Sequence, residues 1–234
     1  MNPLECQETN NSPSWGLIDI MRWKFWPKRK DGGNEYLLRY KDQWVKHNRH
    51  VIIGVSHTYN IPPLLLAAVC HIEVGGDHDS LDDFVYSVRA FDWNGPPFVD
   101  KHLTITNHPS KTSFGQVSIQ LRTVAWDMGL DPNKLSDIQL SEIANCLKRD
   151  VFNIGAVARH IRNIIDHDKL SEPLSEESIR IIGGRYNGGM DDSGYIPLEK
   201  LKNKPKSMDY GYRIILRMRG EGYFRNFPNL VFGQ

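Results

Sequence analysis

The chain has 234 residues, a length that suits one large domain or one domain with an ordered extension. Its 40% hydrophobic and 24% charged residues are ordinary for a globular protein that buries a substantial core. Lys and Arg number 29 and Asp and Glu number 28, so the formal charge of +1 gives no global electrostatic argument for a nucleic-acid partner.

No stretch approaches the roughly 18 apolar residues that a membrane-spanning helix needs, so we expect no transmembrane segment. The first thirty residues lack the apolar core of a secretion signal, and we expect no signal peptide. Cys6, Cys70 and Cys146 are too few and too scattered for a disulfide framework, and no C-x-x-C pair suggests a zinc site. We therefore expect reduced thiols, with at most one bridge, and neither a metal nor a cofactor.

Residues 1–34 show neither helical nor strand periodicity, and we expect them to form an extension ahead of one domain over residues 35–234. The basic and aromatic segment 21–30 could touch an anionic membrane surface or a partner. The interpretation that we favour packs Trp23, Phe25 and Trp26 onto the domain while the lysines stay solvated.

Apolar residues recur between positions 35 and 59 in the pattern of one long helix or two shorter ones. Pro62 and Pro63 then open a helix that ends at Glu73, because proline is tolerated in a first helical turn. Residues 77–110 are polar and rich in helix breakers, which predicts an excursion over the surface. Residues 103–119 alternate enough for a short hairpin near Ser113. Further helices are predicted over 121–128, up to 148 with Ser136 or Ser141 as cap, 153–167, 175–182 and 210–219.

Glu73 is the first candidate for chemistry. The run before it is so apolar that the helix is expected to be buried on most sides, which leaves the acid half in the core and half at the surface. Burial and the negative end of the helix dipole both disfavour a carboxylate, so the pKa of Glu73 is expected to rise. A general acid needs to keep its proton near neutral pH in this way.

Three further segments follow Glu73 along the chain: Ser-Phe-Gly-Gln-Val-Ser-Ile at 113–119, Asn-Ile-Gly-Ala at 153–156 and Arg-Tyr-Asn-Gly-Gly at 185–189. Their order resembles the lysozyme-like superfamily of soluble lytic transglycosylases and goose-type lysozymes. Members of that superfamily have a helix-terminal Glu, a Ser-x-Gly-x-x-Gln-Ile turn, an Asn-Ile helix start and a Tyr-Asn-Ala/Gly-Gly motif. The resemblance covers about residues 59–223.

The resemblance implies a mainly α fold of lysozyme type, with a small β-hairpin and a sugar-binding cleft. The implied substrate is the strand of alternating N-acetylmuramic acid and N-acetylglucosamine in peptidoglycan, and Glu73 would protonate its glycosidic oxygen. The residues that the resemblance implies as substrate contacts are Ser113, Gly115, Ser118, Tyr186, Asn187 and Tyr210.

Two features depart from the family pattern. Ser118 stands where the family has Gln before the Ile, and Gln116 lies two positions earlier, so the turn is shifted or a substrate contact differs. The interval from Glu73 to Ser113 is also longer than in ordinary lytic transglycosylases and comes closer to an enlarged goose-type arrangement.

Glycosidases that use water need a second carboxylate, about 6.5 to 9.5 Å from the acid for inversion or about 5 to 5.5 Å for retention. Asp92 is the first choice, because the flanking Phe91 and Trp93 could fix it at a cleft, and goose-type enzymes have aspartates in the corresponding loop. Lytic transglycosylases instead close a 1,6-anhydro ring with the sugar's own hydroxyl. The long loop with its aspartates favours hydrolysis, and transglycosylation stays open as the alternative. The other aspartates of the loop are Asp77, Asp79, Asp82 and Asp83.

Two alternatives to a muramidase stay open: a non-catalytic peptidoglycan-binding module with a lysozyme fold, and an enzyme acting on chitin-like polymers. Without an export signal, a muramidase would reach the wall as an antibacterial toxin delivered by a secretion machine, or as a phage lysin released through a holin. We favour the delivered effector, acting in the periplasm of a target cell and meeting an immunity protein or a delivery component.

Overall fold

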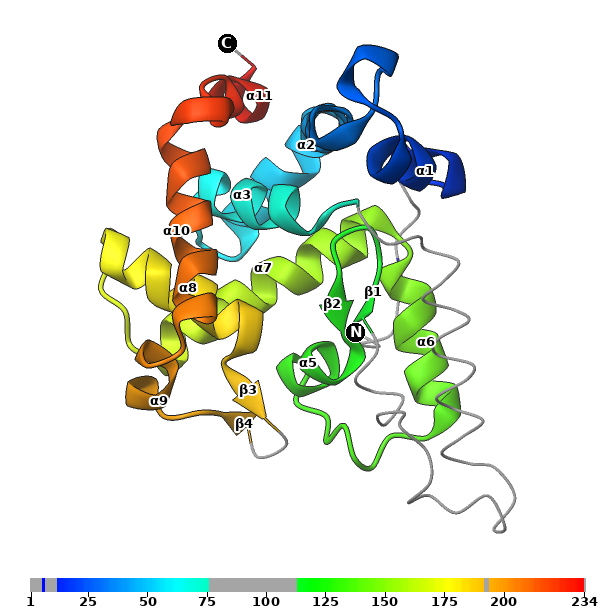
Figure 1. The fold of residues 1–234 in the computed structure, drawn as a ribbon. Helices are drawn as coiled ribbons and strands as arrows, with labels where there is room; N and C mark the ends of the chain where they lie inside the picture. Colours follow the sequence, from blue (N-terminus) through cyan, green and yellow to red (C-terminus); the bar gives the residue numbers. More distant parts are fainter. Residues whose placement is uncertain (1–5, 7–11, 76–112, 192–193, 234) are drawn as a thin grey trace. The chain divides into compact units, whose positions relative to one another are not determined.

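The computed structural model describes residues 6, 12–75, 113–191 and 194–233 (Figure 1). The described chain is mainly α-helical and contains two short antiparallel strand pairs. The predicted fold class is therefore confirmed in its coarse form, a helical protein with a small hairpin. None of the helices within the described ranges is both long and apolar enough to cross a membrane.

The helices and strands differ widely in length, and the strands contain two residues each. In the first half of the chain they are α1 (Leu17–Phe25), η1 (Lys28–Lys30), α2 (Gly33–Thr58), α3 (Pro63–Glu73), β1 (Ser113–Phe114), β2 (Ile119–Gln120) and α5 (Leu121–Asp127). In the second half they are α6 (Asp137–Leu147), α7 (Asp150–His167), α8 (Glu176–Gly188), β3 (Met190–Asp191), β4 (Gly194–Tyr195), α9 (Leu198–Lys202), α10 (Pro205–Arg219), η3 (Gly222–Phe224) and α11 (Phe227–Phe232).

The helix that carries Glu73 has the bounds that the sequence predicts. It begins at Pro63 and ends at Glu73, and every residue from Leu65 to Ile72 is buried. Gly75, at φ +73°, then takes the left-handed conformation that ends the turn, and a Cβ there would lie 3.0 Å from the ring of Tyr40. Glycine suits this position because it has no Cβ to strain the backbone or to meet the ring.

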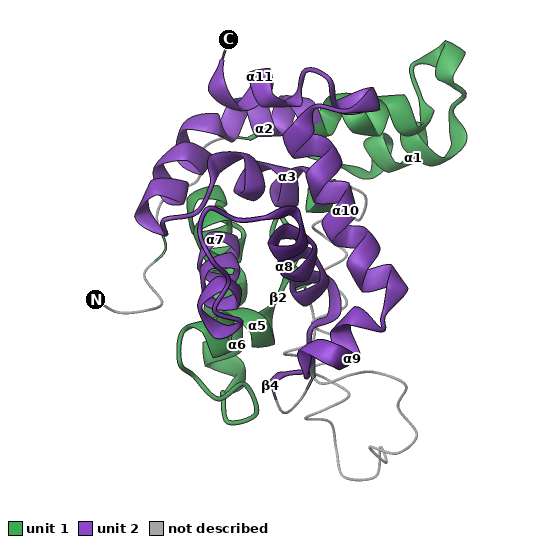
Figure 2. Cartoon of the chain, turned by 90° about the vertical axis from the view of Figure 1, so that its left-hand side faces the viewer, with its two compact units in different colours: residues 1–41, 73–156 green, residues 42–72, 157–234 purple. Residues whose placement is uncertain are grey.

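The chain divides into two compact units, coloured separately in Figure 2. Unit 1 contains residues 1–41 and 73–156, and unit 2 contains residues 42–72 and 157–234. The unit boundaries fall inside α2, α3 and α7, so that Glu73 belongs to unit 1 while the rest of its helix belongs to unit 2. The expected division at residue 34 stays a prediction.

The N-terminal segment is more regular than its sequence suggests. Residues 17–25 form α1. This helix contacts the start of α2, because Trp23 Nε1 donates a hydrogen bond to Asn34 Oδ1 at 3.1 Å. Trp15 is buried beneath this helix, with its ring centroid 4.5 Å from that of Tyr40 and 6.4 Å from that of Trp23. Aromatic packing against another helix therefore stabilises a segment that is too short to be helical alone.

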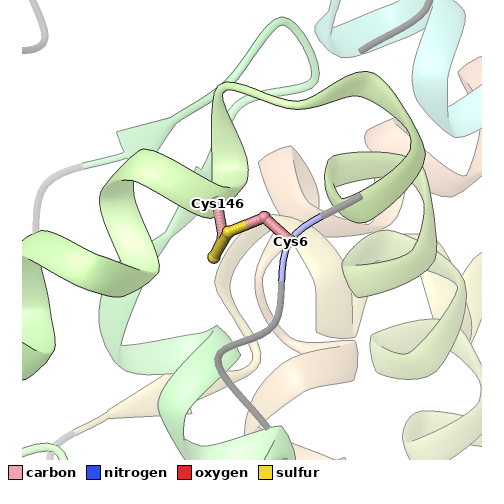
Figure 3. The surroundings of a disulfide bond; sticks show 2 residues. All are labelled: Cys6 and Cys146. Carbon is pink, nitrogen blue, oxygen red and sulfur yellow. A yellow bond between two sulfur atoms is a disulfide. The ribbon is translucent and has the colours of Figure 1, made fainter. Parts of the chain in front are cut away.

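A disulfide joins Cys6 to Cys146 of α6 (Figure 3). The expectation of reduced thiols is wrong for these two residues, and the expectation of at most one bridge agrees with the structure. The two cysteines are 140 positions apart, so no spacing motif could pair them from the sequence. Cys70 lies outside the bridge as a buried thiol of α3, in the apolar surroundings expected for it.

Within unit 2, α8 and α10 pack against each other at glycines. A Cβ on Gly183 would lie 2.4 Å from Gly211 Cα, and a Cβ on Gly211 would lie 2.4 Å from Arg180 Cα. Neither position accepts a side chain without moving the helices apart. The close contact aligns the end of α8, which carries Tyr186, with the first half of α10, which carries Tyr210.

Candidate functional site

Glu73 is the last residue of α3 and is half-buried. The eight residues Leu65 to Ile72 before it are buried, so its backbone is fixed by the core while its side chain lies at the boundary between core and surface. This is the placement that the apolar run predicts.

The backbone immediately after Glu73 is held by two residues of α2. Lys41 is buried, and its ammonium group donates a hydrogen bond to the carbonyl oxygen of Val74. A cation on a carbonyl near a helix C-terminus satisfies an orphan acceptor and complements the helix dipole. The ring of Tyr40 lies against Gly75. The sequence does not reveal either contact, because Lys41 and Val74 are 33 positions apart.

Tyr40 also joins this turn to the hairpin. Its hydroxyl lies 2.8 Å from Gln116 Oε1 and 3.0 Å from the carbonyl oxygen of Pro13, and it can donate to one of these acceptors at a time. Gln116 is the glutamine that stands two positions before the family's usual place. Its side chain is engaged with Tyr40, so the structure gives this departure from the pattern a local structural role.

The side-chain amide of Asn153, in the first turn of α7, holds the backbone of the hairpin turn by two hydrogen bonds. Asn153 Oδ1 accepts from the Val117 N–H at 2.8 Å, and Asn153 Nδ2 donates to the Val117 carbonyl oxygen at 3.0 Å. Gly115 has φ +85°, and a Cβ there would lie 2.6 Å from Asn153 Cγ and 2.5 Å from the Leu147 carbonyl oxygen. Gly115 therefore lets the turn approach Asn153. The segments at 113–119 and 153–156 are thus in direct contact.

The hairpin has one buried and one accessible side. Phe114, Val117 and Ile119 are buried in unit 1, and Phe114 pairs with Ile119 across the two strands. Ser113 and Ser118 are half-exposed. The accessible side therefore offers two hydroxyl groups on a turn whose backbone is bonded by Asn153 and whose Gln116 side chain contacts Tyr40.

Tyr186 and Tyr210 stack on each other in unit 2. Their ring centroids are 5.7 Å apart with an interplanar angle of 22°, and the ring of His160 lies 5.7 Å from that of Tyr186. Tyr210 is only 4% exposed, so its ring supports Tyr186 and does not offer an open face of its own. Tyr186 is half-buried and Asn187 beside it is exposed.

A buried ion pair fixes α8 one residue before Tyr186. Arg185 Nε and Nη2 each lie 2.8 Å from an oxygen of Asp168, and Arg185 Nη1 donates to the carbonyl oxygen of Ile196. Burial raises the pKa of Asp168, but the hydrogen bonds from Arg185 and His167 outweigh burial and leave that pKa below its ordinary value. A bidentate pair of this kind orients both side chains, so it limits the rotation of the end of α8.

His71, two residues before Glu73, is the centre of a second buried network in unit 2. Arg217 Nε donates to His71 Nδ1 at 3.0 Å, so the ring carries its proton on Nε2 and donates it to Asp42 Oδ1 at 2.9 Å. Burial, with the like charge of Arg213, lowers the pKa of Arg217 to about 10, so it stays a cation at neutral pH. Both ring nitrogens of His71 are thus engaged in hydrogen bonds.

No group of three or more His, Cys, Asp or Glu side chains within the described ranges could hold a metal ion. Asp92, the first choice for a second carboxylate, lies outside the described residues. The same holds for the other aspartates of its loop, Asp77, Asp79, Asp82 and Asp83.

The expected site residues therefore fall into two groups. Unit 1 brings together the Glu73 turn and the hairpin with Ser113, Gly115 and Ser118, whereas unit 2 contains Tyr186, Asn187 and Tyr210. Sequence reasoning missed Tyr40 and Lys41, which contact the turn after Glu73, and it noted Gln116 without predicting its contact with Tyr40. No protein-family model, curated protein or solved structure matches the chain.

Proposed function

We propose that this protein cleaves the glycan strand of peptidoglycan between N-acetylmuramic acid and N-acetylglucosamine, with Glu73 as the general acid. The observation that carries the proposal is the connection, within unit 1, between the turn after Glu73 and the hairpin turn through Tyr40. Both turns belong to the ordered motifs that resemble lysozyme-like enzymes. We propose in addition that the fold is of the lysozyme type and contains a sugar-binding cleft.

The proposed chemistry begins with proton transfer from the Glu73 carboxyl group to the glycosidic oxygen as the bond to the anomeric carbon breaks. The hydroxyls of Ser113 and Ser118, with the backbone at Gly115, contact ring substituents of the sugar. The resemblance also implies Tyr186 and Asn187 as substrate contacts, and within unit 2 the ring of Tyr210 stacks on that of Tyr186. The pairs Arg185–Asp168 and Asn153–Val117 support these roles, because each fixes the backbone beside a contact residue.

We favour hydrolysis, in which a carboxylate such as Asp92 activates the attacking water. The alternative is a lytic transglycosylase reaction, in which Glu73 acts as both acid and base and the sugar closes an anhydro ring. The product ends distinguish the two reactions, because water leaves a reducing end and ring closure does not.

The experiment that tests the proposal compares wild type, Glu73→Gln and the matched control Glu142→Gln on purified, dye-labelled peptidoglycan. Glu142 is an exposed glutamate of α6 in the same unit. Loss of a general acid lowers the rate by about 10²- to 10⁴-fold, so Glu73→Gln should release almost no dye while the control equals wild type. Circular dichroism of each variant establishes that it is folded. An inactive wild type, or equal rates for all three proteins, overturns the proposal.

A non-catalytic peptidoglycan-binding module is the second candidate. The specific observation in its favour is that Gln116 contacts Tyr40, so it does not replace the family glutamine whose position Ser118 occupies. This candidate requires that wild type and Glu73→Gln pellet equally with insoluble peptidoglycan and release no fragments. An enzyme specific for chitin-like polymers would instead cleave N-acetylglucosamine oligomers and leave peptidoglycan intact.

We also propose the periplasm of a target cell as the site of action, with delivery as an antibacterial effector and neutralisation by an immunity protein. The Cys6–Cys146 disulfide supports an oxidising compartment, because such bonds persist in the periplasm and are rare in the cytosol. Expression in Gram-negative bacterial cells with and without an export signal tests this proposal. Exported wild type should stop growth and exported Glu73→Gln should not, whereas equal toxicity from the cytoplasm contradicts it.

A further inference from the structure

The outer side of α1 is an exposed apolar stripe. Leu17, Met21 and Phe25 follow one another at four-residue intervals, which places them on one face of the helix, and Ile18 lies beside them. These four side chains are between 55% and 74% exposed. Trp26, directly after the helix, is exposed as well. Apolar side chains gathered in this way on one helix, unlike scattered ones, mark an interaction surface.

The contacts on the other side of α1 keep this stripe facing outward. Asp19 accepts a hydrogen bond from the Tyr36 hydroxyl, and Trp23 donates to Asn34. A Cβ on Gly32 would lie 2.4 Å from the Trp26 carbonyl oxygen, so the backbone at Gly32 packs directly against the C-terminal end of α1. The helix is therefore ordered before any partner binds, and its apolar face is directed away from α2.

Cationic side chains flank the stripe. Lys24 is exposed within α1, and Lys28, Arg29 and Lys30 form η1 directly after it. Lys28 pairs with Glu35, whereas no ion pair of Arg29 or Lys30 is present among the described residues. The long aliphatic stems of such residues can lie along an apolar layer while the charged ends reach its polar boundary.

We propose that α1 and η1 form a docking surface for an anionic lipid bilayer. Leu17, Ile18, Met21 and Phe25 enter the boundary between headgroups and acyl chains, and the η1 cations contact lipid phosphates. Trp26 lies at the depth where indole rings are enriched. An apolar stripe with basic flanks is the composition of interfacial helices, whereas phosphate contacts of a nucleic acid would leave the apolar side chains unused. The inference does not depend on glycan cleavage.

The test measures sedimentation of the full chain with sucrose-loaded vesicles of phosphatidylcholine alone or mixed with phosphatidylglycerol. Ile18→Ser removes one stripe residue, and Ile138→Ser is its matched control, because Ile138 is equally exposed (72% against 71%) on α6. Ile18→Ser should weaken partitioning about ten-fold, as expected for losing most of one buried aliphatic side chain, and the control should not.

A second pair of variants tests the charges. Replacing Arg29 and Lys30 with Gln should weaken binding to anionic vesicles by about five-fold per cation, roughly thirty-fold together. The control replaces the exposed lysines Lys200 and Lys206 of unit 2 in the same way and should bind as wild type does. Added salt should weaken wild-type binding to anionic vesicles, because exposed charges are screened.

The expected result is that wild type binds anionic but not neutral vesicles, that both test variants bind more weakly by these factors, and that both controls bind as wild type does. Wild type that ignores anionic vesicles overturns the proposal, and so does equal loss in test and control variants. If Ile18→Ser abolishes binding to a second protein while no form of the chain binds vesicles, the surface is a protein interface and the lipid proposal is wrong.

Discussion

Replacing Asn153 with alanine tests how the hairpin turn is held. Asn153 is 1% exposed, and its amide group makes both hydrogen bonds of the buried Val117 peptide groups, at 2.8 and 3.0 Å. Alanine leaves a buried N–H and a buried C=O without these partners. The turn at Gly115 should loosen, because its closest side-chain neighbour is the same amide group.

The magnitude follows from these two hydrogen bonds. An unsatisfied buried donor or acceptor costs about 1 to 3 kcal/mol, so the loss of both bonds should destabilise unit 1 by about 2 to 6 kcal/mol. That is a large effect for one substitution, against a total of roughly 5 to 15 kcal/mol for a typical domain. Asn153→Asp keeps the acceptor for the Val117 N–H but places an ionised oxygen opposite the Val117 carbonyl, so it should regain stability when acid protonates it.

Urea unfolding followed by circular dichroism measures the free energy, and amide hydrogen exchange reports on the Val117 N–H directly. The matched control is Asn145→Ala, an exposed asparagine on α6 of the same unit, which should stay within about 0.5 kcal/mol of wild type. Asn153→Ala that unfolds like this control, or that keeps wild-type protection of the Val117 N–H, would refute the reasoning.

Three further predictions concern other contacts. Asp168→Asn should lower stability at pH 7 by about 3 to 5 kcal/mol, because it leaves Arg185 as a buried cation without its anion. The pKa of Asp168 is depressed in the folded state, so its contribution to stability is present above about pH 4 and is lost as the pH falls through the folded-state pKa. The melting temperature of the variant should therefore fall less steeply than that of wild type as the pH is lowered below about 4. An equally steep fall in both proteins would contradict this. Cys6→Ser should cost about 2 to 5 kcal/mol under oxidising conditions and nothing under reducing ones, measured by urea unfolding with and without dithiothreitol. Tyr40→Phe keeps the ring against the Glu73 turn but loses the hydroxyl contact with the hairpin, so it should cost about 0.5 to 1.5 kcal/mol in urea unfolding and lower peptidoglycan release; wild-type values in both assays would count against the role of Tyr40.

The sequence predicts the helix of Glu73 well because its signals are local. Pro63 opens the helix, the residues from Leu65 to Ile72 are almost all apolar, and glycine follows the end, so the bounds Pro63–Glu73 agree with the prediction. Ser136 is similarly visible as a cap, since Gln139 three residues later completes the reciprocal pair of hydrogen bonds. Ser141, the alternative cap, lies inside the same helix.

What the sequence does not reveal depends on long-range contacts. The helix α1 is missed because packing of Trp23 against α2 stabilises it, rather than its own periodicity. The interpretation that packs Trp23, Phe25 and Trp26 together onto the domain is wrong for the exposed Phe25 and Trp26, whereas Trp23 contacts Trp15 and Asn34, both within residues 1–34. The bond between Cys6 and its partner likewise joins positions too distant for a spacing rule.

The candidate site divides in the same way. Sequence motifs single out Glu73 and the hairpin. Lys41 and Tyr40 contact the turn after Glu73, but they belong to α2, where the sequence has no motif at those positions. Helix α8 also extends through Gly188, beyond the predicted end at residue 182, because Arg185 is fixed by a distant Asp168.

The proposed function is tested most directly by mass spectrometry of the soluble products released from purified peptidoglycan. Wild type should release disaccharide muropeptides with reducing N-acetylmuramic acid ends, and Glu73→Gln, folded by circular dichroism, should release none. Products with anhydro ends would show that the reaction is lytic transglycosylation and not hydrolysis, with Glu73 still the acid. No products from wild type, or the same products from both proteins, would contradict the account.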